Sequence, residues 1–293
     1  MSDTRVLHVI ARMNVGGTAK YVGELVKGIP NSKLVTGSVQ GLEIEDSILN
    51  EIPYFRIKSL GRKISFVNDF KAWIELRKII KETKPKILHT HTFKAGLIGR
   101  LIPGRYKRIH TFHGHLFEDP SFSAVAKFFI LVVEKILAYR TDTLISVGNN
   151  VGIEIRKRGI GKSKKWISIP PGVKIQNIYN RQDIRKELGL PESEFIIGWL
   201  ARMVPVKNPE LFLKIAIESP EHYFAMGGGG EMLTNITKYA PKNIKVLGWI
   251  DSEKFWSAVD IAISTSDNEG MPLALIEAQM YGVPVICKDV GSN

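Results

Sequence analysis

The segment KILHTHTFKAGLIGRLIPGRYKRIHTF, residues 86–112, contains a complete strand–helix–strand unit. "KILHTH" (86–91) and "RIHTF" (108–112) are short apolar runs typical of buried strands, and "AGLIGRLI" (95–102) between them is typical of a helix. Two strands joined by a helix run parallel, and a parallel sheet needs helices on both of its faces. This segment therefore predicts an α/β protein.

The same alternation extends in both directions along the chain. Upstream, strands are predicted at "RVLHVI" (5–10) and "KLVTGSV", with a glycine turn "NVGG" and helices up to about residue 27 and over 66–82. Downstream, helices are predicted over 121–139 and 149–158, with strands at "TLISVG" and "WISIPPG". Alternation of this kind indicates a doubly wound sheet.

The prolines and glycine of "IPPGVKIQNIYN" (169–180) interrupt the alternation, which then starts again. The predicted helices after this linker are 181–188, 208–217, 231–239 and 272–281, with strands at "FIIGWL" (195–200), 222–226, "IKVLGWI", "DIAIS" and "PVIC". We therefore expect two Rossmann-like domains, 1–170 and 171–293, that face a cleft, because such sheets bind ligands beyond the carboxyl ends of their strands. The chain stops at "DVGSN" directly after a strand, so the second domain is expected to be incomplete at its C-terminus.

Charge is distributed unevenly between the two halves. Residues 1–170 contain 29 Lys and Arg against 14 Asp and Glu, whereas the remainder contains 12 against 15. A basic first domain favours an anionic partner such as a membrane surface or a phosphorylated substrate, although ordinary solubility would also explain it. Nucleic acid is not expected, because no aromatic stacking platform accompanies the charge. Cys287 is the only cysteine, which fits a reducing cytoplasm.

Two cations mark a candidate anion site in "GWLARMVPVKNPELFLKIA" (198–216). Arg202 and Lys207 lie between a predicted strand and the helix that begins near Asn208. Fixed cations beside helix-terminal N–H groups suit a diphosphate, and a solvated turn is the alternative. "MGGGGEM" (226–232) is either a second loop that approaches a ligand closely or a flexible turn. "NVGGTAK" (14–20) lacks the third glycine of a dinucleotide-binding turn.

Histidines cluster at the predicted strand ends in "HTHTF" (89–93) and "HTFHGHLFE" (110–118). His89 with His91, and His113 with His115, form two H-x-H pairs that would suit a metal only with a carboxylate such as Glu118 or Asp119 nearby. The sequence contains no Asp-x-Asp pair that would hold a metal for a nucleotide diphosphate. We therefore expect no metal, and a single histidine that hydrogen-bonds substrate hydroxyls.

Two carboxylates stand eight positions apart in "DNEGMPLALIEAQMYGVPVI" (267–286). Glu269 precedes a helix predicted to start near Pro272, and Glu277 lies inside it. Eight residues are about two helical turns, so we expect both carboxylates on one face. Glu277 is surrounded by apolar residues, and a buried carboxylate has to be paired or bound. Carboxylates accept hydrogen bonds from the vicinal hydroxyls of sugars and ribose. The pair is therefore a candidate sugar or ribose site.

These residues together resemble the signature of retaining, nucleotide-sugar-dependent glycosyltransferases of the GT-B fold. The resemblance rests on Arg202, Lys207 and the E-x7-E pair, and on "VGG", "HTFKAGLIGR", "HTFHGHLFE", "ISIPPGV", "GGGGE" and "EGMPLALIEAQMYGVPVI". It covers nearly the whole chain. The group includes many bacterial enzymes that build lipopolysaccharide, capsule and exopolysaccharide.

The resemblance implies a role for each matching residue. Arg202 and Lys207 would hold the diphosphate of the donor, and Glu277 would bind the ribose hydroxyls. Glu269, with the backbone of Gly270, Met271 and Pro272, would contact the donor sugar and the phosphates. The remaining implied contacts are His113 to the sugar, Ile250 to the base through its backbone, and Gly16 and Gly17 along the acceptor side.

The resemblance also implies the reaction and the partners. A sugar would pass from a nucleotide donor, UDP-linked, to a glycan or lipid-linked acceptor with retention of anomeric configuration and without a metal or other cofactor. The protein would act in the cytoplasm, with its basic domain and the apolar stretch 121–140 near the inner face of the membrane, although a helix covering a sheet explains that stretch more simply. A non-hydrolysing sugar-nucleotide epimerase and an inactive or partner-dependent binding module remain as alternatives.

Overall fold

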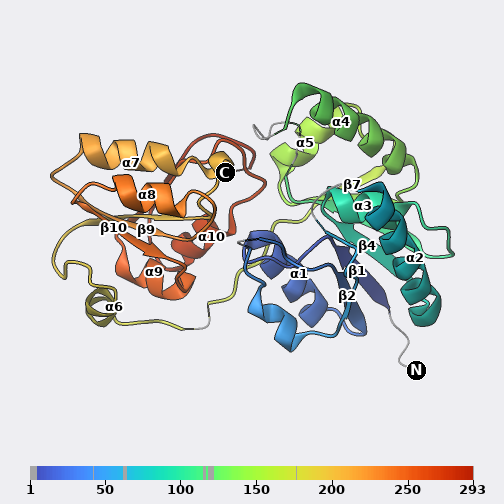
Figure 1. The fold of residues 1–293 in the computed structure, drawn as a ribbon, viewed down its shortest axis with the longest axis horizontal. Helices are drawn as coiled ribbons and strands as arrows, with labels where there is room; N and C mark the ends of the chain where they lie inside the picture. The colour runs from blue at the N-terminus through green and yellow to red at the C-terminus, as the bar shows by residue number, and fades with distance from the viewer. Residues whose placement is uncertain are drawn as a thin grey trace. The chain divides into compact units, whose positions relative to one another are not determined.

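The structure, a computed structural model, describes residues 5–41, 43–61, 65–114, 117, 122–175 and 177–292. The chain separates into two compact units, and the change from the first to the second falls between Pro171 and Gly172. Each unit is a parallel sheet with helices packed on it, as Figure 1 shows. The predicted α/β fold with two doubly wound domains is therefore confirmed.

The first unit contains a seven-stranded sheet in the order β3-β2-β1-β4-β5-β6-β7, with every neighbouring pair parallel. The strands are β1 (Val6–Ile10), β2 (Ser32–Thr36), β3 (Tyr54–Arg56), β4 (Ile87–His91), β5 (Lys107–Phe112), β6 (Thr143–Ser146) and β7 (Lys165–Ser168). The helices are α1 (Gly17–Gly28), the 3-10 helix η1 (Ser47–Glu51), α2 (Phe66–Thr83), α3 (Phe93–Arg100), α4 (Ala124–Tyr139) and α5 (Asn149–Lys157).

Local sequence explains where these helices begin. Ser65 and Ser123 cap α2 and α4 by accepting a hydrogen bond from the backbone N–H three residues further on. The helix predicted over 95–102 starts two residues earlier, at Phe93, and ends at Arg100. The predicted helices 66–82 and 149–158 are confirmed, with ends that differ by one residue.

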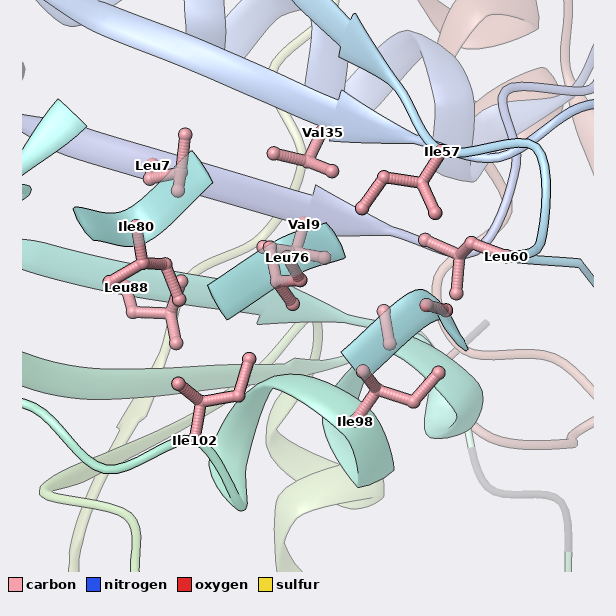
Figure 2. Packing of buried hydrophobic residues seen from close by; sticks show 12 residues of the cluster. Leu7, Val9, Val35, Ile57, Leu60, Leu76, Ile80, Leu88, Ile98 and Ile102 are labelled. Carbon is pink, nitrogen blue, oxygen red and sulfur yellow. The ribbon is translucent and has the colours of Figure 1, made fainter. Parts of the chain in front are cut away.

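The main core of the first unit lies between the sheet and helices α2 and α3. Figure 2 shows the side chains of β1, β2 and β4 pointing toward those of the two helices. Leu7 and Val9 of β1 belong to this cluster and His8 between them does not, as the alternation of side chains along a strand requires. The cluster consists of Leu7, Val9, Val35, Ile57, Leu60, Ala72, Leu76, Ile80, Leu88, Ala95, Ile98 and Ile102.

The second unit contains a five-stranded parallel sheet in the order β10-β9-β8-β11-β12. Its strands are β8 (Ile196–Leu200), β9 (Tyr223–Gly227), β10 (Ile244–Gly248), β11 (Ile261–Ser264) and β12 (Val285–Cys287). Its helices are α6 (Arg181–Glu187), the 3-10 helix η2 (Pro205–Lys207), α7 (Pro209–Glu218), α8 (Leu233–Tyr239), α9 (Ser252–Ala258) and α10 (Leu273–Met280).

Both faces of this sheet are covered. Ile196 on β8 belongs to a cluster with residues of α6, α9 and α10, whereas its neighbours Ile197 and Trp199 belong to a cluster with residues of α7 and α8. Figure 1 shows α7 and α8 on one side of the strands and α9 on the other. The period of two along β8 therefore positions helices on both sides.

Helix α9 was not predicted. It has only seven residues, and its apolar positions Phe255, Trp256 and Ala258 all fall within about one turn. The i, i+3, i+4, i+7 spacing by which a helix is recognised therefore cannot appear. Asp251 starts it by accepting hydrogen bonds from the N–H groups of Glu253 and Lys254. An aspartate before a short apolar cluster was the available signal.

Candidate functional site

The strand order of the second unit indicates where a ligand would bind. From β8 the chain proceeds to β9 and β10 on one side of the sheet and then returns to β11 on the other. The order thus reverses between β8 and β11, and doubly wound sheets bind ligands at such a point, beyond the carboxyl ends of the strands. The loops that follow these two strands carry Arg202, Lys207 and Glu269.

The structure brings Lys207 and Glu269 into direct contact. The Nζ atom of Lys207 donates a hydrogen bond to Oε1 of Glu269 at 2.5 Å, and both side chains are mostly shielded from solvent. A cation and a carboxylate 62 positions apart in sequence therefore meet at the switch point. Arg202 is half-buried in the same loop as Lys207.

Buried hydrogen bonds fix the backbone that carries Lys207. Thr265 directly follows β11, and its hydroxyl donates a hydrogen bond shared by the carbonyl oxygens of Lys207 (3.0 Å) and Asn208 (2.8 Å). The same hydroxyl accepts from Nε1 of the buried Trp199 at 2.9 Å. These bonds tie the loop after β8 to the loop after β11, so the position of the lysine is determined by the sheet.

The glycine run 227–230 packs against the loop that carries Arg202. Gly228 has a φ of 118°, and a Cβ there would lie 1.9 Å from the carbonyl oxygen of Ala201. The N–H of Met203 donates to the carbonyl oxygen of Gly229 at 2.9 Å. The requirement for glycine here thus arises from close packing of two loops of this chain.

The predicted relation between the two glutamates was wrong in one respect. Helix α10 begins at Leu273, so Glu269 lies in the preceding loop with Gly270, Met271 and Pro272, and the angle between residues of one helix does not apply. Both glutamates are nevertheless buried, with 8% of Glu269 and 7% of Glu277 exposed. Ile250, the predicted base contact, is half-buried just after β10.

The first unit has a switch point of its own, between β1 and β4. From β1 the chain proceeds to β2 and β3, and then returns to β4 on the other side of β1. Gly16 caps α1 with a φ of 147°, which favours glycine, and Gly17 is the first residue of the helix. His91 is the last residue of β4, and His113 directly follows β5.

Histidines of this unit form a chain through its core, and sequence reasoning did not find it. Nδ1 of His8 lies 3.1 Å from Nε2 of His91, and Nδ1 of His91 lies 3.1 Å from Nε2 of His113. Tyr21 on α1 closes one side, with its ring 5.0 Å from that of His113. His8 in the middle of an apolar strand was the missed signal, because a buried polar side chain needs a partner.

Burial keeps these rings neutral. Desolvation lowers the pKa of His8 to about 4 and holds the pKa of His89 and His91 well below the usual value, because the charged form loses its hydration. Burial also lowers the pKa of His113 and, together with the nearby Arg100 guanidinium, that of His110. A neutral imidazole has one N–H and one acceptor nitrogen, so each ring can take part in a directed hydrogen bond.

A metal ion would have to compete with these bonds. Ligand nitrogens of His8, His89 and His91 lie within 4.8 Å of one another. However, His8 and His91 bond to each other, and Nε2 of His89 lies 2.7 Å from the Thr111 hydroxyl. The predicted partners of a metal site that remain, His115, Glu118 and Asp119, lie outside the described residues. We assign no metal ligands to this cluster.

Comparison with known proteins defines the class first. A crystal structure of Anabaena Alr3699/HepE in complex with UDP and glucose superimposes with a TM-score of 0.79 over 98% of this chain and 82% of that chain, at 16% identity. Two doubly wound units with candidate residues at their switch points are therefore the two-domain architecture of a glycosyltransferase fold.

The family follows from the sequence matches. Residues 15–177 match the family described as Glycosyltransferase Family 4, and residues 180–293 match Glycosyl transferases group 1. The chain belongs to the group 1 glycosyltransferases. An Escherichia coli relative named UDP-Gal:alpha-D-GlcNAc-diphosphoundecaprenol alpha-1,3-galactosyltransferase is 29% identical over all of this chain and 81% of its own length. The Escherichia coli O-antigen biosynthesis glycosyltransferase WbnH is 26% identical over 97% of this chain and 80% of its own length.

Proposed function

We propose that this protein transfers a sugar from a UDP-linked donor to a glycan or lipid-linked acceptor, with retention of anomeric configuration, in the synthesis of a cell-surface polysaccharide. The observation that carries the proposal is the Lys207–Glu269 pair at the switch point of the second unit. The printed names of the relatives support the reaction class and the lipid-linked acceptor. The UDP in the HepE complex supports the donor.

In this proposal the cations stabilise the leaving group. The bond between the anomeric carbon and the diphosphate breaks, negative charge develops on the diphosphate oxygen, and Lys207 and Arg202 neutralise that charge without a metal. The acceptor oxygen bonds to the anomeric carbon on the same face, and its proton passes to the diphosphate. Glu269 exchanges part of its contact with Lys207 for the donor sugar, assisted by the backbone of residues 270–272.

The other predicted residues orient the donor and acceptor. Glu277 accepts hydrogen bonds from the ribose hydroxyls, and the backbone near Ile250 contacts the base. His113 contributes to recognition of the transferred sugar. Gly16 and Gly17 leave room on the acceptor side, since neither residue has a side chain.

Removal of the Lys207 ammonium is expected to abolish most nucleotide binding. Calorimetric titration of UDP, GDP and TDP without added metal should show preferential UDP binding, weakened roughly 10- to 100-fold in Lys207→Ala, because charge-assisted hydrogen bonds contribute about 1.5–3 kcal/mol. Glu277→Ala should weaken UDP binding less, through the ribose alone. Lys214→Ala, on the exposed side of α7, is the matched control and should bind like the wild type.

Two outcomes would contradict the assignment. Equal UDP affinity in wild type, Lys207→Ala and Glu277→Ala would place the nucleotide elsewhere. Conversion of a UDP-sugar to its epimer without any acceptor would indicate the epimerase alternative instead.

The exposed side of α4 supports an acceptor at a membrane surface. Its buried side packs through Ile130 and Ala138, whereas six large apolar side chains are exposed to solvent: Val125, Phe128, Phe129, Val132, Ile136 and Tyr139. No helix among the described residues has the length and apolar character required to cross a bilayer. We therefore propose that the protein works in the cytoplasm, with α4 resting on the inner face of the membrane and Lys127 and Lys135 near anionic headgroups. The simpler interpretation, a helix that only covers the sheet, does not explain six exposed apolar residues.

Membrane binding is expected to depend on that apolar side. Liposomes with anionic lipid should sediment the wild type at low salt and release part of it at high salt, because the electrostatic contribution is screened. A Phe128→Ser/Phe129→Ser variant should bind several-fold more weakly at every salt concentration. Tyr239→Ser, which alters an exposed aromatic residue on α8, is the control. Binding that is the same in both variants would show that α4 is not the contact.

A further inference from the structure

The chain of histidines has a direction that the geometry determines. His91 uses both ring nitrogens, one toward His8 and one toward His113, each at 3.1 Å. Because each neutral ring has a single N–H, each N···N contact must contain one proton from one side. The three rings therefore all have the proton on Nδ1 or all have it on Nε2.

The two arrangements differ in what they leave at the buried end. Nε2 of His8 is buried and has no hydrogen-bond partner within the described parts of the chain. With protons on Nε2, this atom would be a buried N–H without an acceptor. With protons on Nδ1, it would be an unpaired acceptor, which proteins tolerate better than an unpaired N–H. The structure therefore favours the Nδ1–H form for all three rings.

The consequence appears at His113, the other end of the three hydrogen-bonded histidines. His113 accepts from His91 through Nε2 and retains its proton on Nδ1, and this nitrogen makes no hydrogen bond to another described residue. His113 lies just beyond the carboxyl end of β5, on the edge of the sheet where ligands of this fold class bind.

We propose that His91 and His8 are positioning residues that hold His113 as its Nδ1–H tautomer, so that His113 offers substrate a hydrogen-bond donor and cannot act as a base through that nitrogen. This rests on the proposed function only in assigning the transferred sugar as the group that receives the bond. A hydroxyl oxygen of a sugar is a suitable acceptor for a neutral N–H.

The tautomer can be measured directly and independently of any activity. Long-range ¹⁵N–¹H correlation spectra of the full chain labelled at histidine distinguish a protonated from an unprotonated ring nitrogen. The His113 signals are assigned by their loss in His113→Asn. We expect a protonated Nδ1 and an unprotonated Nε2 on His113 near pH 7.5. A protonated Nε2, or a doubly protonated ring, would overturn the proposal whatever the protein binds.

Two replacements of His91 separate hydrogen-bond direction from packing. The amide N–H of His91→Asn can still donate to His113 and should preserve the Nδ1–H tautomer, whereas His91→Leu removes the donor and should give mixed tautomers. Affinity for UDP-galactose should fall about tenfold in His91→Leu, the value of one hydrogen bond, with affinity for UDP unchanged and with recovery in His91→Asn. Equal loss for both ligands, or no recovery in the asparagine variant, would show a purely structural role. If neither ligand binds wild type, the proposed function fails and the wild-type spectrum still decides the tautomer.

Discussion

Between pH 6 and pH 5 the first unit is expected to unfold while the second stays folded. Four buried histidines of the first unit, His8, His89, His91 and His110, are 0–6% exposed. Desolvation holds each of their pKa values below that of an unfolded chain, to about 4 for His8. The second unit contains only His222, which is exposed.

The direction in which the stability of the first unit changes with pH follows from proton binding. Below pH 6.5 the unfolded chain takes up protons that the folded unit does not, so the free energy of unfolding falls as pH falls, down to the folded pKa values. Each such histidine lowers the free energy of unfolding by up to about 1.4 kcal/mol for every pH unit between its unfolded and its folded pKa. A domain is stabilised by about 5–15 kcal/mol in total, so the combined loss from several histidines is a large fraction of the stability of the first unit.

Hydrogen exchange detected by mass spectrometry would follow each unit separately as the pH is lowered. The stability of the first unit should fall with a slope approaching five protons, one for each of these four histidines and one for His113, whose pKa burial also lowers. His110→Asn should reduce that slope by about one. His222→Asn is the control and should leave the transition unchanged. Unfolding of both units at one pH, or a first unit still protected at pH 4.5, would contradict the expectation.

How far the sequence predicts this structure depends on the length of each pattern. The parallel strands and the longer helices repeat their pattern often enough to be recognised, as 66–82 shows. The seven-residue α9 and the three-residue β3 do not. Parallel order is implied by alternation, but the reversal between β8 and β11 that locates the site depends on contacts far apart in sequence.

In the candidate site, too, single residues were predictable from the sequence but contacts between distant residues were not. Arg202, Lys207 and Glu269 were recognisable in combination, because Arg202 and Lys207 alone also fit a solvated turn, whereas together with the E-x7-E pair they match a family signature. The Lys207–Glu269 contact and the support from Thr265 were not, because they join residues about 60 positions apart. Likewise the histidine pairs were visible, but the partner of His91 is His8, which stands alone in the sequence.

Replacement of Arg100 by methionine is expected to destabilise the first unit by about 3–5 kcal/mol, because it leaves a buried charge unpaired. Nη2 of Arg100 on α3 donates to both carboxylate oxygens of Glu134 on α4, at 2.8 Å each, and the side chains are 1% and 2% exposed. Burial raises the pKa of Glu134 and lowers that of Arg100, and the attraction between the two groups opposes both shifts.

The double replacement tests whether the ion pair adds net stability to the fold, or only offsets the cost of burying its own two charges. Arg100→Met and Glu134→Leu should each be costly, whereas Arg100→Met/Glu134→Leu should unfold in urea close to the wild type, because the desolvation of both charges is removed together. Lys107→Met, at the exposed Lys107–Asp142 pair, is the control and should change little. Additive losses in the double variant would mean that the two side chains act independently. A loss in the double variant about as large as in either single variant would mean that the pair itself holds α4 against α3. In that case the apolar side of α4 would be positioned by an ion pair, and its membrane binding should weaken in either single variant.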